Sequence, residues 1–278
     1  MQIGISTASF YPLLLEEGIT LAAQLGFRKL EVFLNAESEY APAFCDERRR
    51  QMENLGVRAQ SVHPFTSSIE GHLLFSGYPR RTQDALDQYR YYMEAAARLG
   101  ARYFTFHGET LRARGLPPSS PDAMRFDTYA ALCEIGEEFG VVFTQENVSW
   151  CRSADPLFLR LLYENVPKLR FTLDTKQALR AGHSWRDYVD TVGDRIVNLH
   201  ISDYNSESDC LLPGRGILQF EDLFQRMKKH GYTGDAIVEV YRTAFQQPEE
   251  LEASRRYLEE QVLSSSGKPA GVVLRRRV

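Results

Sequence analysis

The sequence contains little cysteine, and its cysteines show no paired spacing. Cys45, Cys133, Cys151 and Cys210 are scattered through 278 residues without a CxxC motif. This pattern excludes a disulfide framework and a zinc ribbon, and it is typical of reduced intracellular thiols. The chain also lacks a basic start followed by an apolar run, and no stretch approaches about 18 apolar residues. We therefore expect a cytoplasmic protein without a signal peptide, a membrane span or a membrane partner.

An excess of basic residues is also missing. The formal net charge is -4, and we expect no nucleic-acid partner because tight binding normally needs a basic face. No GxGxxG motif follows the first predicted strand, near residues 3–7, which argues against dinucleotide binding. What the chain does contain is ordinary for a globular enzyme, with 43% hydrophobic and 25% charged residues. Its length allows one large domain or two small ones.

Glycine marks the ends of several predicted helices. In "AAQLGFRKLEVF", "MENLGVRAQSVH", "AARLGARYFTFHG" and "GEEFGVVFTQEN", an amphipathic helix stops at Gly26, Gly56, Gly100 and Gly140 respectively. The residue after a helix often adopts a left-handed conformation, which only glycine adopts at little cost. Each glycine is followed by a short β-branched and aromatic run, which predicts a buried strand.

The pattern of a helix, a small-residue stop and a short β-branched and aromatic run predicts eight strands that alternate with eight helices. The strands are expected near 3–7, 29–33, 58–63, 102–107, 141–146, 169–174, 195–201 and 235–241. The helices are expected near 16–25, 46–55, 80–99, 121–139, 155–164, 184–192, 220–230 and 248–263. Strict alternation implies parallel strands joined by right-handed crossovers. Eight units favour an α/β fold of the single-domain (β/α)8 TIM barrel type over an open doubly wound sheet.

We expect the barrel to span residues 1–263 and residues 264–278 to form a C-terminal tail. The tail begins with the serine, glycine and proline of "SSSGKPAG", which is a linker composition. Its three arginines at 275–277 fit either a solvated terminus or a subunit contact. Assembly into a homo-oligomer therefore stays open.

Side-chain alternation predicts which strand residues face the barrel axis. In "YFTFH", Phe104 and Phe106 would face the helices, while Thr105 and His107 would face the axis. The runs "RFTLD" and "IVNLH" follow the same rule and end on an inward polar residue, and "AIVEV" places Glu239 inward, one residue before its end. The strand "FTQEN" follows the alternation less regularly, because the polar Gln145 would point outward, towards the helices. Active sites of (β/α)8 barrels lie at this carboxyl end of the strands.

The fifth to eighth predicted strands carry, at or close to their carboxyl ends, Glu146, Asp174, His200 and Glu239, which we call the quartet. Any one of these residues on its own would be explained as a polar side chain that forms hydrogen bonds with its neighbours. Three carboxylates at one barrel mouth, however, would repel one another unless they bound a cation or took up protons. Three oxygen donors and one imidazole suit Mn²⁺, Mg²⁺ or Co²⁺ at least as well as Zn²⁺. We therefore expect one divalent metal ion, with Mn²⁺ as the first choice.

The motifs "FTQEN", "FTLDT", "NLHISD", "LLPGRG" and "AIVEVY" resemble, in order and context, those of the xylose isomerase-like barrels. The resemblance covers roughly residues 1 to 263. This superfamily includes sugar phosphate isomerases and epimerases, ketose 3-epimerases, hydroxypyruvate isomerases, inosose dehydratases and, more distantly, endonuclease IV. Resemblance to the ketose 3-epimerases implies that Glu146, Asp174, His200 and Glu239 are metal ligands and that Glu146 and Glu239 are also the catalytic acid and base. It also implies a small carbohydrate substrate.

The leading hypothesis is a metal-dependent isomerase or epimerase of a sugar, a sugar derivative or a polyol. Removing a proton beside a carbonyl gives an enediolate, whose charge a divalent cation stabilises. The nearest alternative is a dehydratase or lyase similar to inosose dehydratase. An enzyme similar to endonuclease IV is disfavoured, because Gln177 stands where that pattern has a histidine and "SDCLLPGRG" lacks an Asp-x-His. A non-catalytic barrel is a further alternative, against which the intact quartet argues.

Several other side chains are candidate substrate contacts. His63 and His107 end the third and fourth predicted strands, and we favour contact with substrate hydroxyls over a structural role for both. Gln177 is also a candidate for substrate binding. Arg152 and Arg215 lie in loops, where each could bind a phosphate or carboxylate or could simply be solvated. Lys176, beside Asp174, fits an acid, a base or a substrate contact, but we favour an ordinary lysine at a helix start.

Overall fold

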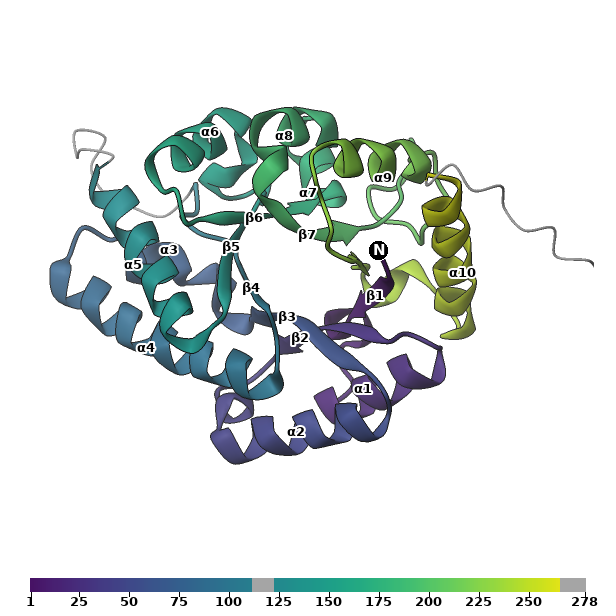
Figure 1. The fold of residues 1–278 in the computed structure, drawn as a ribbon, viewed down its shortest axis with the longest axis horizontal. Coiled ribbons are helices and arrows are strands. Elements are labelled where there is room, and N and C mark those ends of the chain that lie inside the picture. Colours follow the sequence, from purple (N-terminus) through teal and green to yellow (C-terminus); the bar gives the residue numbers. More distant parts are fainter. Residues whose placement is uncertain (112–122, 266–278) are drawn as a thin grey trace, which may run out of the picture.

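Eight parallel strands form the centre of the fold. The computed structural model describes residues 1–111 and 123–265. The strands pair in chain order, and β8 pairs with β1, so the sheet closes into a barrel (Figure 1). They are β1 (Ile3–Ser6), β2 (Lys29–Leu34), β3 (Arg58–Pro64), β4 (Tyr103–Phe106), β5 (Val142–Glu146), β6 (Arg170–Asp174), β7 (Ile196–Ile201) and β8 (Ala236–Val238). The predicted (β/α)8 barrel is confirmed.

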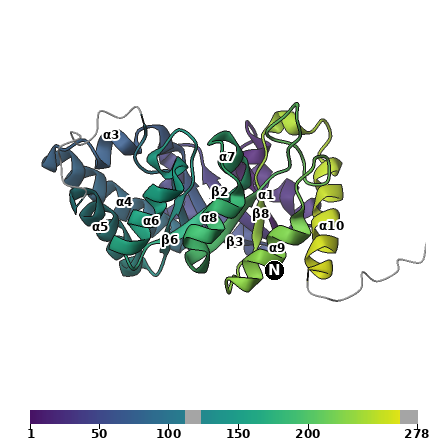
Figure 2. The same cartoon turned by 90° about the horizontal axis from the view of Figure 1, so that it is seen from above.

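Helices surround this barrel on the outside (Figure 1). They are α1 (Leu15–Gln24), α2 (Pro42–Asn54), α3 (Glu70–Leu74), α4 (Pro79–Leu99), α5 (Ala123–Phe139), α6 (Pro156–Asn165), α7 (Thr175–Arg180), α8 (Trp185–Val192), α9 (Phe220–Lys229) and α10 (Glu249–Ser264). The short helices α3 and α7 were not predicted, and they lie on the side of the barrel away from the N-terminus (Figure 2). The first two residues of the helix predicted at 121–139 and residues 266–278 of the predicted tail lie outside the described residues. Within the described residues, no helix is long and apolar enough to span a bilayer.

The glycines that were predicted to end helices adopt the expected conformation. The φ angles of Gly26, Gly56, Gly100 and Gly140 are +83°, +67°, +77° and +71°. A side chain at any of these positions would force an L-residue into the strained left-handed region. The chain therefore turns from helix to strand at the points that the sequence indicates.

The two faces of the strands separate apolar from polar side chains as predicted. On the outer face, Phe104 and Phe106 pack against Tyr89 of α4, with ring centroids 6.0 and 5.7 Å apart. Fully burying such a side chain contributes roughly 1.5–3 kcal/mol. On the inner face, Thr105 Oγ1 donates to Glu31 Oε2 at 3.1 Å. The barrel interior is thus a packed layer with polar side chains at its centre.

Strand β8 is shorter than the predicted 235–241. Its last residue is Val238, although Glu239 N still donates to Ile201 O of β7 at 3.1 Å. The next backbone amide, that of Val240, donates instead to the Ser9 hydroxyl at 3.2 Å. The side chain of Ser9 therefore takes over the hydrogen bond that would have continued the strand, and Glu239 lies at the point where the strand ends.

Candidate active site

The barrel brings the quartet together at the carboxyl ends of four neighbouring strands. Glu146 and Asp174 end β5 and β6, His200 lies near the end of β7, and Glu239 follows β8. Each residue offers a ligand atom, and these atoms all lie within 4.8 Å of one another. Three of the four side chains are buried, and that of Glu239 is 15% exposed. The residues thus have the donor types and the proximity of a metal site.

The imidazole of His200 has a different carboxylate at each ring nitrogen. Its Nδ1 lies 3.0 Å from Glu146 Oε1 and 3.5 Å from Glu239 Oε2, so this atom faces the quartet. Its Nε2 lies 2.8 Å from Glu31 Oε2. A metal-binding histidine commonly donates its second ring N–H to a carboxylate, which fixes the tautomer. Glu31 is positioned to do this for His200.

Glu31 is the main site residue that the sequence analysis missed. Its buried carboxylate also accepts hydrogen bonds from Ser61 Oγ at 2.8 Å and from Thr105 Oγ1 at 3.1 Å. The prediction considered only residues at strand ends, whereas Glu31 lies within β2. The alternation in "KLEVFL" could have revealed it, because the outward positions of the apolar Leu30 and Val32 direct Glu31 towards the barrel axis.

The two carboxylate oxygens of Asp174 have different surroundings. Its Oδ1 accepts a hydrogen bond from Gln177 N at 2.9 Å and caps α7. Its Oδ2 is buried and has no hydrogen-bond partner among the described residues, and Lys176 Nζ lies 3.5 Å away. Burial raises the pKa of Asp174 well above its usual range, and the charges of Glu239 and Glu146 act in the same direction, against that of Lys176. A buried orphan oxygen within a set of oxygen and nitrogen donors fits a divalent cation.

The other two carboxylates of the quartet favour their ionised forms. Burial acts to raise the pKa of Glu146, but contacts with His107 and His200 hold it well below its usual range. Burial acts in the same way on Glu239, and the charges of Lys176 and His200 outweigh it, so its pKa is also low. An ionised carboxylate can bind a cation or accept a proton. The two glutamates therefore have the charge state that the predicted ligands and base require.

His63 and His107, predicted to contact substrate, lie against Glu146. Their Nε2 atoms are 2.8 Å apart, and His107 Nε2 lies 2.9 Å from Glu146 Oε2. Burial acts to lower the pKa of His63, but the hydrogen bond with Glu146 and nearby carboxylate charges raise it to about 9. The three residues form a second group that could hold a metal ion. We call this group the trio, and it shares Glu146 with the quartet.

Two further candidates, Arg152 and Gln177, make contacts within the protein. Arg152 lies 3.7 Å from Glu109 Oε2, and its guanidinium carbon lies 4.5 Å from the ring centroid of Phe158. Gln177 Oε1 accepts hydrogen bonds from Ser149 Oγ at 2.8 Å and Ser149 N at 3.2 Å. Gln177 thus links α7 to the loop that follows β5. Contact of either residue with substrate stays a prediction.

The loop "LLPGRG" is organised by Asp203, which follows β7. The buried Asp203 Oδ2 accepts hydrogen bonds from Gly214 N at 3.0 Å and Gly216 N at 2.9 Å. A Cβ on Gly216 would lie 2.2 Å from a backbone oxygen, so glycine is required there. Arg215 lies between these glycines, is half exposed and pairs with Glu250 at 2.6 Å. The motif therefore has a structural explanation, and anion binding by Arg215 stays a prediction.

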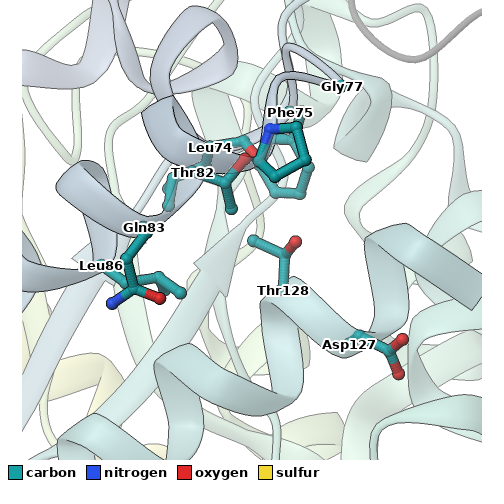
Figure 3. A pocket seen from close by; sticks show the side chains of 9 residues that line it. Leu74, Phe75, Gly77, Thr82, Gln83, Leu86, Asp127 and Thr128 are labelled. Carbon is teal, nitrogen blue, oxygen red and sulfur yellow. The ribbon is translucent and has the colours of Figure 1, made fainter.

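A separate hollow lies between α4 and α5. It has a volume of about 260 Å³, and Leu74, Phe75, Leu86 and Thr128 are among its lining residues (Figure 3). No member of the quartet lines it. Because this hollow gathers none of the candidate ligands, we place the active site at the quartet.

Three known proteins illustrate what the chain is similar to. Fructoselysine 3-epimerase from Escherichia coli O157:H7 is 23% identical over 258 residues, covering 89% of this chain and 93% of that protein. The structure of D-psicose 3-epimerase from Clostridium cellulolyticum H10 matches with a TM-score of 0.76 at 16% identity, covering 94% of this chain and 99% of that one. The IOLI protein, whose structure contains a zinc atom, matches with a TM-score of 0.74 at 15% identity, covering 95% and 98%. These structural matches agree with the barrel fold.

A family model gives a more direct assignment. The model described as "Xylose isomerase-like TIM barrel" matches residues 19–261. This range contains the quartet, the trio and Glu31, together with all the strands except β1. The resemblance stated from the motifs is confirmed, and the chain belongs to the xylose isomerase-like TIM barrel family.

Proposed function

We propose that the chain is a metal-dependent epimerase or isomerase of a sugar or sugar derivative that works by proton transfer beside a carbonyl. The observation that carries this proposal is the convergence of the quartet, whose ligand atoms lie within 4.8 Å of one another. The relatives support the class of reaction, because fructoselysine 3-epimerase and D-psicose 3-epimerase are both named as 3-epimerases. The same relatives favour an enzyme over a non-catalytic barrel.

The proposed cofactor is one divalent ion held by Glu146, Asp174, His200 and Glu239. The donor set favours Mn²⁺, with Mg²⁺, Co²⁺ and Zn²⁺ as alternatives. When bound, such an ion supplies a Lewis acid that stabilises negative charge on substrate oxygens. His200 would bind through Nδ1, because Glu31 lies at its other ring nitrogen.

The protein groups that would move the proton are Glu146 and Glu239. They come from β5 and from the end of β8, two strands that are not neighbours in the barrel. They can therefore approach a substrate carbon from different sides. One carboxylate removes the proton, and the other returns a proton to the opposite face, which inverts the carbon. Return of the proton to the neighbouring carbon of the enediolate would instead move the carbonyl and make the enzyme an isomerase.

The test is turnover in D₂O with a panel of ketoses, keto-inositols and oxidised glycosides in the presence of Mn²⁺. We expect one substrate to give a product of the same chemical composition with deuterium at the carbon beside the carbonyl. Mass spectrometry and NMR measure both. Turnover without deuterium at any carbon would contradict the proton-transfer mechanism, and a product lighter by one water would identify a dehydratase.

Substitution of one glutamate tests the assigned role. Glu239→Gln keeps the size of the side chain but removes the proton carrier, and we expect a loss of activity on the order of 10²–10⁴-fold. A matched control is Glu164→Gln, which alters a carboxylate that is 52% exposed and paired with Arg160 on α6. The Mn²⁺ affinity of both variants is measured alongside, because Glu239 is also a proposed ligand. Unchanged activity in Glu239→Gln would remove this residue from the mechanism.

A further inference from the structure

A buried lysine lies directly against the quartet. Lys176, the second residue of α7, has a side chain that is only 4% exposed. Its Nζ lies 3.1 Å from Glu239 Oε2 and 3.5 Å from Asp174 Oδ2. The ammonium also lies 5.0 Å from the ring centroid of Tyr241, which follows β8. Two of the four candidate ligands therefore already contact a cation that belongs to the protein.

The contacts of Lys176 explain how an ammonium can be buried at this position. Burial alone disfavours the charged form of a lysine, but the carboxylates of Asp174 and Glu239, at 3.5 and 3.1 Å from Nζ, pair with the ammonium and stabilise it. The side chain is therefore charged. A buried ammonium is tolerated when carboxylates pair with it, and removal of one partner leaves a charge without compensation. The lysine and the two carboxylates thus depend on each other when no other cation is present.

The charge balance of the site indicates how Lys176 would affect a bound metal ion. As ligands of a bound ion, the three carboxylates would be ionised and His200 would be neutral, so the ligands would carry three negative charges, of which a divalent cation would compensate two. The ammonium of Lys176 supplies the remaining positive charge. The same ammonium, however, repels any second cation that binds to Asp174 and Glu239, because like charges at a few ångströms interact strongly in a poorly solvated site.

We infer that Lys176 is a resident counter-ion of the quartet, which competes with the divalent ion for Asp174 and Glu239 and thereby weakens metal binding. This inference rests on the proposed metal site. An ordinary lysine at the start of a helix, as the sequence suggested, would be solvated and would leave metal affinity unchanged. A counter-ion instead compensates part of the negative charge of the metal-free site and makes the bound ion more readily exchangeable.

The test is the affinity of the chelator-treated protein for Mn²⁺, measured by isothermal titration calorimetry. Lys176→Met removes the ammonium and keeps much of the apolar stem, so we expect Mn²⁺ to bind at least about tenfold more tightly. Lys176→Arg keeps the charge, and its affinity should stay near that of the wild type. Lys168→Met is the matched control, because Lys168 precedes β6, at the opposite end of that strand from Asp174, and is 54% exposed.

Circular dichroism establishes that each variant is folded, and Lys176→Gln replaces the methionine variant if that variant does not fold. Mn²⁺ binding in the neutral variant that is equal to or weaker than in the wild type would overturn the inference while leaving the proposed metal site intact. If neither the wild type nor any variant binds Mn²⁺, the proposed metal site fails and the counter-ion role fails with it. Tighter binding in Lys168→Met as well would show a general charge effect and would also overturn the inference.

Discussion

At the residue scale, a single contact links the interior of the barrel to the quartet. Glu31 Oε2 lies 2.8 Å from His200 Nε2, and the same oxygen accepts hydrogen bonds from Ser61 and Thr105. These partners fix the carboxylate within the barrel. Because a hydrogen bond at Nε2 places the lone pair of a neutral imidazole on Nδ1, Glu31 would prepare His200 to bind an ion that Glu31 itself need not touch.

We expect Glu31→Ala to weaken Mn²⁺ binding by about 10–100-fold, which is the usual effect of losing such a supporting contact. Glu31→Gln should recover most of this loss, because its amide oxygen can still accept a hydrogen bond from Nε2. Thr105→Val is the control, since it removes another partner of Glu31 but leaves the contact with His200. Isothermal titration calorimetry measures all three. An equal loss in the alanine and glutamine variants would assign the effect to charge instead of orientation.

The residues of the site differ in how far the sequence could predict them. The four members of the quartet were found because strand alternation and the direction of the chain place the last residues of parallel strands at one barrel mouth. Glu31 was missed because it lies within a strand, where a carboxylate has no positional signal apart from the parity of its neighbours. The contact between His63 and His107 depends on how neighbouring strands align, which alternation along one strand does not give.

At the element scale, a short helix stabilises the loop that carries His107. Glu70 is the first residue of α3, and its buried Oε2 accepts hydrogen bonds from the backbone N–H groups of His107 and Gly108, both at 3.1 Å. Gly108 has a φ of +86°, and a Cβ there would lie 2.7 Å from Gln145 Oε1. The helix was not predicted because a five-residue segment is too short to show helical periodicity.

The burial of Glu70 predicts a specific pH dependence of stability. Burial raises the pKa of Glu70 above its usual range, although His107 and Tyr89 act in the opposite direction. The stability contributed by a carboxyl with a raised pKa is fully present below the unfolded pKa of about 4.3 and is lost as the pH rises through the folded pKa. Glu70→Gln does not titrate, so its stability relative to the wild type should increase with pH over this interval.

Relative to the wild type, the free energy of unfolding of Glu70→Gln should increase by up to about 1.4 kcal/mol for each pH unit between the unfolded and folded pKa values of Glu70. Urea unfolding at a series of pH values from 4 to 8 measures it. Glu53→Gln serves as the control, because Glu53 is 60% exposed and pairs with Arg49 on the same helix. Stability curves for Glu70→Gln and wild type that run parallel at all pH values would contradict the assignment of a raised pKa to Glu70.

At the scale of the whole molecule, ligands for the proposed ion come from the second half of the barrel. The quartet joins β5, β6, β7 and the end of β8, so an ion bound there would connect segments that separate when the chain unfolds. A ligand that binds only the folded state stabilises it by mass action. The metal site should therefore be detectable as an increase in the free energy of unfolding, even before a substrate is known.

The Asp174→Asn variant separates the stabilisation by bound metal from the stability of the metal-free fold. Asparagine can still cap α7 through its side-chain oxygen, whereas alanine would lose the hydrogen bond to Gln177 N at a cost of about 1 kcal/mol. We therefore expect the metal-free variant to remain folded with a modest loss of stability, because Lys176 loses its pairing with Asp174 but keeps that with Glu239. At a Mn²⁺ concentration 100 times the dissociation constant of the wild type, the wild type should gain about 2.7 kcal/mol, and the variant should gain little of this.

The number of ions per chain decides whether the quartet accounts for all of the stabilisation by Mn²⁺. We expect elemental analysis of protein purified without chelator to give one divalent ion per wild-type chain and a large loss in Asp174→Asn. The trio offers a place for a second ion, but it shares Glu146 with the quartet and has only one carboxylate. His63→Gln, which alters the trio alone, should therefore retain the single ion and its stabilising effect. Two ions per wild-type chain, with one lost in His63→Gln, would contradict the one-metal site and assign a metal to the trio.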